Sequence, residues 1–126
     1  YSERLFTQNI IHPNANIESN KLGNSNHISS NCYLTPTANI GSSNIIYSGT
    51  MLEHECSLGN DNIITVNVSV CGRVKIGNRC FIGAGAVLLP NISICDDVII
   101  GAGAVVTKNI EIPGTYVGTP AKILSK

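Results

Sequence analysis

The chain has 126 residues, of which 43% are apolar and 13% charged, and its eight basic residues balance eight acidic ones. This length predicts one domain, and the composition excludes a disordered chain. The zero net charge argues against nucleic-acid and membrane-surface partners. No apolar run is long enough to cross a bilayer, no signal peptide opens the sequence, and the five cysteines lack CxxC spacing. We therefore expect a cytoplasmic protein with free thiols.

Residues 1–10 precede the regular part of the chain and begin with Tyr rather than Met. We interpret this segment as a linker, or as the remnant of an N-terminal domain that has been removed. Ile11 and Ile17 then start a series of aliphatic residues with a step of six, which is displaced by one residue before Ile28. The displacement indicates a one-residue deletion near residues 21–24.

From Ile28 onward an aliphatic residue occupies every sixth position. All fifteen positions of this series are Ile, Leu or Val: Ile28, Leu34, Ile40, Ile46, Leu52, Leu58, Ile64, Val70, Ile76, Ile82, Leu88, Ile94, Ile100, Val106 and Ile112. A period of six fits neither an amphipathic helix nor a single long strand. It predicts short strands joined by corners, three strands to a coil, with one aliphatic side chain per strand pointing inward.

The residues around each aliphatic position support this interpretation. Two residues earlier the side chain is usually slim, as at Asn26 and Cys32, and one residue later glycine recurs, as at Gly41 and Gly59. Glycine tolerates positive φ and close backbone approach, as a corner requires. We therefore predict an all-β fold, a parallel β-helix of about five to six coils over residues 11–116, followed by a short C-terminal tail over residues 117–126.

Five segments resemble the hexapeptide-repeat acyltransferases, and within them the NeuD-type bacterial sugar acetyltransferases: IIHPNANI (10–17), LEHECSLGND (52–61), GRVKIGNRCFIGAGAVLLPN (72–91), VIIGAGAVVTKNI (98–110) and VGTPAK (117–122). The resemblance implies a left-handed β-helix, a homotrimer and acetyl-CoA as the acetyl donor. It also implies a nucleotide-sugar or sugar acceptor used in surface-glycan synthesis. The chain departs from the family at Tyr47, where Asn is usual, and nothing in it matches the family's N-terminal Rossmann-type domain.

His54 is the candidate general base. It lies two residues after Leu52, on the outside of a coil, between Glu53 and Glu55. A carboxylate on one ring nitrogen fixes the tautomer and raises the basicity of the other nitrogen. The resemblance makes His54 the base and Glu55 its partner. Adjacent residues of a strand point in opposite directions, so Glu55 reaches His54 only if a corner or a neighbouring subunit bends the path. The alternative is a solvated surface histidine.

The segments FIGAGAVL (81–88) and IIGAGAVV (99–106) lie eighteen residues apart and therefore stack. Their small residues predict a groove with accessible backbone groups, along which an amide-rich pantetheine arm can lie. By resemblance, Ile63, Ala84 and Ala102 contact acetyl-CoA. The alternative is that these residues only satisfy corner geometry. In the same eighteen-residue spacing, Gly72 follows His54 and leaves room where a reactive group must approach.

The resulting functional prediction is transfer of an acetyl group to the amine of a nucleotide-activated amino sugar. Two alternatives stay open: O-acetylation of sialic acid or another sugar, and a non-catalytic β-helix scaffold. A zinc hydratase needs three histidines converging on one metal. His12, His27 and His54 do not share an eighteen-residue column, so we expect no metal site.

Overall fold

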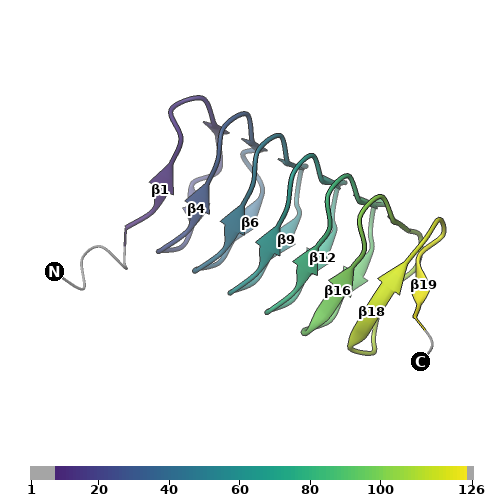
Figure 1. Cartoon of the computed structure of the whole chain (residues 1–126). Coiled ribbons are helices and arrows are strands. Elements are labelled where there is room, and N and C mark those ends of the chain that lie inside the picture. The colour runs from purple at the N-terminus through teal and green to yellow at the C-terminus, as the bar shows by residue number, and fades with distance from the viewer. Residues whose placement is uncertain (1–7, 125–126) are drawn as a thin grey trace, which may run out of the picture.

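A computed structural model describes residues 8–124, which form a three-sided stack of coils with no helix (Figure 1). Before the C-terminal end, each coil contributes one short strand to each of three sheets, and these strands pair in parallel. Sheet A contains β1 (Ile10–Ile11), β4 (His27–Ile28), β7 (Ile45–Ile46), β10 (Ile63–Ile64), β13 (Phe81–Ile82), β16 (Val98–Ile100), β18 (Gly114–Val117) and β19 (Lys122–Ile123). Sheet B contains β2 (Asn16–Ile17), β5 (Tyr33–Leu34), β8 (Met51–Leu52), β11 (Ser69–Val70), β14 (Val87–Leu88) and β17 (Val105–Val106). Sheet C contains β3 (Lys21–Leu22), β6 (Asn39–Ile40), β9 (Ser57–Leu58), β12 (Lys75–Ile76) and β15 (Ser93–Ile94).

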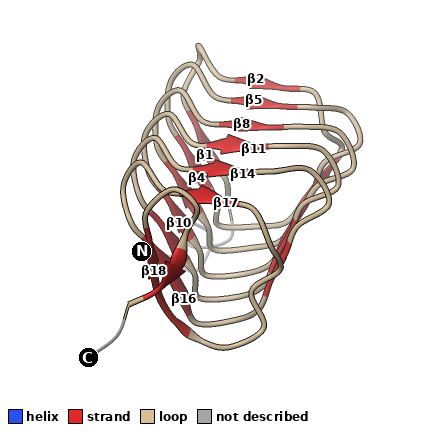
Figure 2. Ribbon diagram, turned by 90° about the vertical axis from the view of Figure 1, so that its right-hand side faces the viewer, coloured by secondary structure: helices blue, strands red, loops and turns tan. Residues whose placement is uncertain are grey.

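The corners between the sheets form three edges of a prism, which we name A–B, B–C and C–A in chain order. Figure 2 shows the strands of sheet B stacked one above another along one face. In the middle of the prism, paired residues are eighteen apart, as in Val70 with Leu88. The predicted arrangement of three strands per coil is confirmed.

The register changes near both ends of the prism. In the first coil Ile17 pairs with Leu34, seventeen residues later, whereas Leu22 already pairs with Ile40 at the full eighteen. The missing residue therefore belongs to the corner 18–20, slightly earlier than the predicted 21–24. In the last coil the prediction for Ile112 is wrong. This side chain is 65% exposed, and Ile110, at 6% exposure, bridges to Ile94 instead.

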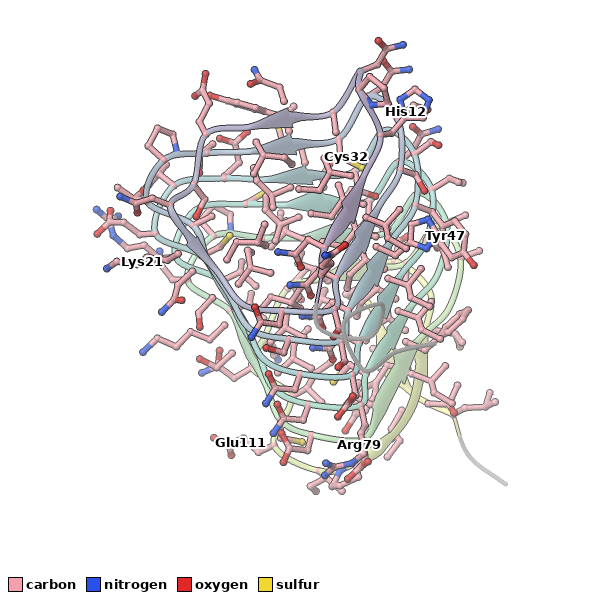
Figure 3. The ribbon with its side chains drawn as sticks, turned by 90° about the vertical axis from the view of Figure 1, so that its left-hand side faces the viewer. His12, Lys21, Cys32, Tyr47, Arg79 and Glu111 are labelled. Carbon is pink, nitrogen blue, oxygen red and sulfur yellow. The ribbon has the colours of Figure 1, made fainter. Side chains whose placement is uncertain are left out.

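The core contains two kinds of inward side chain. The aliphatic series from Ile28 to Val106 is buried throughout, and the slim residues two positions earlier are buried beside it, including Cys32, Ala38 and Ala86. Figure 3 looks along the prism from its N-terminal end and shows Cys32 inside the triangular section, with Lys21, Tyr47 and Arg79 around its outside. Burying one aliphatic side chain contributes ~1.5–3 kcal/mol before the loss of chain entropy is counted.

Three asparagines replace apolar residues in the core at the C–A edge. Asn26, Asn44 and Asn62 are at most 1% exposed. The side-chain oxygens accept backbone N–H groups eighteen residues further along, from Asn44 (2.9 Å), Asn62 (2.9 Å) and Cys80 (2.8 Å). The side-chain amides donate to the carbonyls of Gly41, Gly59 and Gly77, each at 2.9 Å. This asparagine ladder satisfies buried backbone groups that the short strands leave unpaired.

Left-handed backbone conformation recurs at one position of the repeat, three residues after the inward aliphatic. Its members with positive φ are Ser25, Asn31, Ser43, Gly49, Glu55, Asp61, Asn67, Arg73, Arg79, Gly85, Asn91, Asp97 and Gly103. The glycines directly after an aliphatic, such as Gly59, do not have positive φ, so the expectation that they supply this backbone conformation is wrong. They are required by close packing, because a Cβ on Gly59 would lie 2.5 Å from the carbonyl oxygen of Gly77.

The outer faces of the three sheets differ in polarity. Sheet C presents Lys21, Asn39, Ser57, Lys75 and Ser93, whereas sheet A presents mainly Ile10, Ile45, Ile63, Phe81 and Ile99. Sheet B presents a mixture that includes Met51, Val87 and Val105. At the C-terminal end β18 extends sheet A across the expected boundary at residue 116, and β19 pairs with it antiparallel. The expected linker falls largely on residues 1–7, which lie outside the described part of the chain.

Candidate active site

His54 lies at the B–C edge, in the corner that joins β8 to β9, and its side chain is 57% exposed. Its Nδ1 is 3.3 Å from Oε1 of Glu55. In the tautomer with the proton on Nδ1, His54 donates this hydrogen bond and Nε2 keeps a free lone pair. The structure therefore brings together the two residues that were predicted to form the base and its partner.

Glu55 reaches its neighbour because the backbone bends at this residue. Glu55 has φ of 59° and occupies the left-handed position of the repeat. Its backbone N–H donates to Oγ1 of Thr37, 2.9 Å away in the preceding coil. The required bend thus comes from the corner itself, and no second subunit is needed for the contact.

Gly72 lies against the His54 ring from the following coil. A Cβ built on Gly72 would be 2.5 Å from Nε2 of His54 and 2.6 Å from Cε1. Any side chain at position 72 would therefore displace the His54 ring. The expected pairing of His54 with an open position one coil later is therefore present in the structure.

Arg73 is a member of this site that sequence reasoning missed. Its Nη2 is 3.1 Å from Oε1 of Glu55, and its backbone N–H donates to the carbonyl of His54 at 2.9 Å. Thr37, Glu55 and Arg73 are spaced by eighteen residues and occupy the same position of the repeat, which is left-handed at Glu55 and Arg73. Extending the eighteen-residue column from Glu55, rather than from His54 alone, would have identified Arg73.

The thiols near this edge are poor nucleophile candidates. Burial raises the pKa of the Cys56 thiol to about 12, and the Glu53 carboxylate adds to the rise. Burial, followed by the same carboxylate, also raises the pKa of Cys71. Both thiols are therefore protonated at neutral pH. All five cysteines are free, and residues 8–124 include no group of three His, Cys, Asp or Glu placed to hold a metal ion.

Ala84 and Ala102 lie at a different edge from His54. They occupy the A–B edge, stacked one coil apart, and the N–H of Gly103 donates to the carbonyl of Ala84 at 2.7 Å. A Cβ on Gly85 or Gly103 would meet nothing within 4 Å, so the edge is open to the outside here. This edge is therefore free of neighbouring side chains beside Gly85 and Gly103.

Ile63 is not in the Ala84–Ala102 column. It lies on the outer face of sheet A, between Ile45 and Phe81, and is partly exposed. Its contact with acetyl-CoA stays a prediction, as do those of the two alanines. The described part of the chain contains no helix that is long and apolar enough to cross a membrane.

The fold and sequence of this chain are similar to those of known transferases. Residues 55–89 and 73–108 match the bacterial transferase hexapeptide family, described as six repeats. The acetyltransferase domain of PglB from Neisseria gonorrhoeae superposes with a TM-score of 0.88 at 26% identity, covering 94% of this chain and 58% of that one. PerB from Caulobacter crescentus, solved with CoA and GDP-perosamine, has a TM-score of 0.79 and 31% identity over the same shares of the two chains. WeeI from Acinetobacter baumannii has a TM-score of 0.78 and 27% identity, covering 94% of this chain and 55% of that one. No curated protein sequence matches the chain.

The fold is therefore a left-handed parallel β-helix, which confirms the predicted fold class. Residues 55–108 of the chain match the hexapeptide-repeat transferase family, and the similarity of the whole fold to sugar N-acetyltransferases confirms the resemblance seen in the sequence. The chain spans less than two thirds of the length of the structures that it matches first, at 58%.

Proposed function

We propose that this chain is the catalytic β-helix domain of an acetyltransferase that moves an acetyl group from acetyl-CoA to the amine of a nucleotide-activated amino sugar. The observation that carries the proposal is the His54–Glu55 pair at 3.3 Å, with Nε2 of His54 held over Gly72. The similarity to PerB, solved with CoA and GDP-perosamine, supports the choice of donor and acceptor. We also propose a cytoplasmic location for the reaction, because acetyl-CoA is the proposed donor.

In the proposed reaction Nε2 of His54 takes a proton from the acceptor amine as its nitrogen attacks the thioester carbon. Glu55 accepts the Nδ1–H hydrogen bond, keeps the ring in the required tautomer and stabilises the imidazolium that forms. The carbon–sulfur bond then breaks, and His54 returns the proton to the departing CoA thiolate. Amide, thiol and unchanged enzyme are the products.

The proposed site includes two protomers. His54 is on the B–C edge and Ala84 and Ala102 are on the A–B edge, with sheet B between them. In a threefold arrangement with sheet B facing the symmetry axis, the B–C edge of one protomer lies against the A–B edge of the next. Corresponding coils of the three protomers are then at the same height along the axis. The polar outer face of sheet C then faces water. We propose a homotrimer with three such shared sites.

The test is acetyl transfer by the purified chain with GDP-perosamine, UDP-4-amino sugars and sialic acid as acceptors. Thiol release measures turnover, and mass spectrometry identifies an amide or an ester. We expect an amide product and a loss of ~10²–10⁴-fold in His54→Ala, which lies outside the core. A His54→Ala variant within threefold of the parent contradicts the proposed base. Light scattering that reports a monomer contradicts the shared site, and an ester product assigns the chain to sugar O-acetylation.

A further inference from the structure

One oxygen of Glu55 has two partners. Oε1 is 3.3 Å from Nδ1 of His54 and 3.1 Å from Nη2 of Arg73. All three side chains are more than half exposed. An exposed glutamate has several rotamers in which its carboxylate points into water, so the contact with His54 requires something that selects the observed one.

We propose that Arg73 is a positioning residue, which holds the Glu55 carboxylate on Nδ1 of His54 and balances its charge. This inference rests on the proposed function, in which His54 is the base. Arg73 touches neither substrate in this account and acts only through Glu55.

The backbone places Arg73 and Glu55 for this interaction. Both residues are in the left-handed conformation, with φ of 61° and 59°. The N–H of Arg73 donates to the carbonyl of His54 at 2.9 Å, and the N–H of Glu55 donates to Oγ1 of Thr37 at 2.9 Å. Three successive coils thus supply Thr37, Glu55 and Arg73, one residue each. The cation and the carboxylate start from fixed Cα positions and need only their side-chain torsions to meet.

Charge balance is the second part of the role. Glu55 contacts the ring, Arg73 contacts Glu55, and Glu53 precedes His54 in the chain. The neighbouring thiols of Cys56 and Cys71 stay neutral because burial raises their pKa. Two carboxylates with no cation favour the imidazolium, which cannot accept a proton. Arg73 supplies a positive charge 3.1 Å from the Glu55 carboxylate and so offsets one of these two charges.

The sign of the effect provides the test. In Arg73→Met the acid limb of the kcat/KM profile moves to higher pH, on the order of half a pH unit for such exposed charges, and kcat falls. In Glu55→Gln the acid limb moves to lower pH. Arg73→Lys keeps the charge and returns the limb towards that of the parent, although it loses the geometry of the guanidinium. KM for acetyl-CoA is unchanged in all three variants.

Arg79→Met is the matched control. Arg79 also occupies the left-handed position, with φ of 57°, and pairs with Asp97 at 2.8 Å, but at the C–A edge. Its loss should leave the pH profile unchanged. An acid limb in Arg73→Met that coincides with that of the parent overturns the proposal while the proposed function stands. If the parent transfers acetyl to no acceptor, the proposed function fails. In that case the His54 ring signals are followed by NMR in the parent and in Arg73→Met. An upward shift of their titration midpoint in the variant supports the role of Arg73, and an unchanged midpoint overturns it.

Discussion

Replacing Gly72 by alanine inserts one methyl group directly against the His54 ring. The new Cβ would be 2.5 Å from Nε2, so the ring must retreat by about 0.9 Å to reach the ordinary contact distance of 3.4 Å. Gly72 does not have positive φ, and alanine therefore adds no backbone strain. A displacement of ~1 Å in a reacting group costs on the order of 10²-fold in rate. We expect a loss of this size in kcat, with the fold retained.

The assay is a cycle of four proteins: the parent, Gly72→Ala, His54→Ala and the double variant, compared by thiol release at saturating acetyl-CoA. Without the ring the methyl group has nothing to displace, so Gly72→Ala should have almost no effect in the His54→Ala background. Circular dichroism checks the fold of each protein. Equal losses in the two backgrounds would refute the reasoning, because the methyl group would then act on something other than His54.

Three further predictions concern the core, the thiols and the A–B edge. Asn44→Ala leaves the buried backbone N–H of Asn62 and the partly buried carbonyl of Gly59 without partners, and should lower the free energy of unfolding by about 2–5 kcal/mol in urea. The exposed Asn39→Ala should cost under ~0.5 kcal/mol, and equal costs would contradict the role of the ladder. Because burial raises the pKa of Cys56 to about 12, the protonated thiol stabilises the fold fully below its unfolded pKa near 9, and this contribution is lost as pH rises towards 12. Unfolding curves across this range should therefore fall less steeply in Cys56→Ala than in the parent, and parallel curves would contradict the assignment. Ala102→Trp should weaken acetyl-CoA binding at least tenfold, or ~1.4 kcal/mol by calorimetry, whereas Ser93→Trp on sheet C should not; equal affinities would exclude the A–B edge as the donor groove.

The fold could be predicted from sequence because its period is visible in single residues. One inward side chain of every strand from Ile28 to Val106 is aliphatic, so this series of residues was found without reference to any structure. The error at Ile112 has a simple cause. Both Ile110 and Ile112 are aliphatic, and a step of six selects the second, whereas the last coil is two residues shorter and buries the first. Periodicity cannot locate a deletion when an aliphatic residue also occupies the extrapolated position.

The site was only partly predictable. His54 and Glu55 are neighbours in sequence, but their contact depends on a backbone angle that no motif states, since glutamate at positive φ is uncommon outside such corners. Arg73 contacts Glu55 because the intervening eighteen residues complete one coil. The separation of His54 from Ala102 by a whole face follows from counting strands, which sequence reasoning on single motifs did not do.

Between Leu22 and Val106 the step of six is unbroken, and the two deletions within residues 8–124 lie outside that stretch, in the corner 18–20 and after Val106. His54, Gly72, Ala84 and Ala102 all lie within it. A single residue added or removed there would have to be absorbed in the length of one corner, as it is at 18–20, and would distort the edge to which that corner belongs. A whole coil would instead shift the later edges by ~4.8 Å along the axis and leave their orientation intact. The axial distance between His54 and the Ala84–Ala102 column can therefore change without reorienting either edge only in steps of one whole coil.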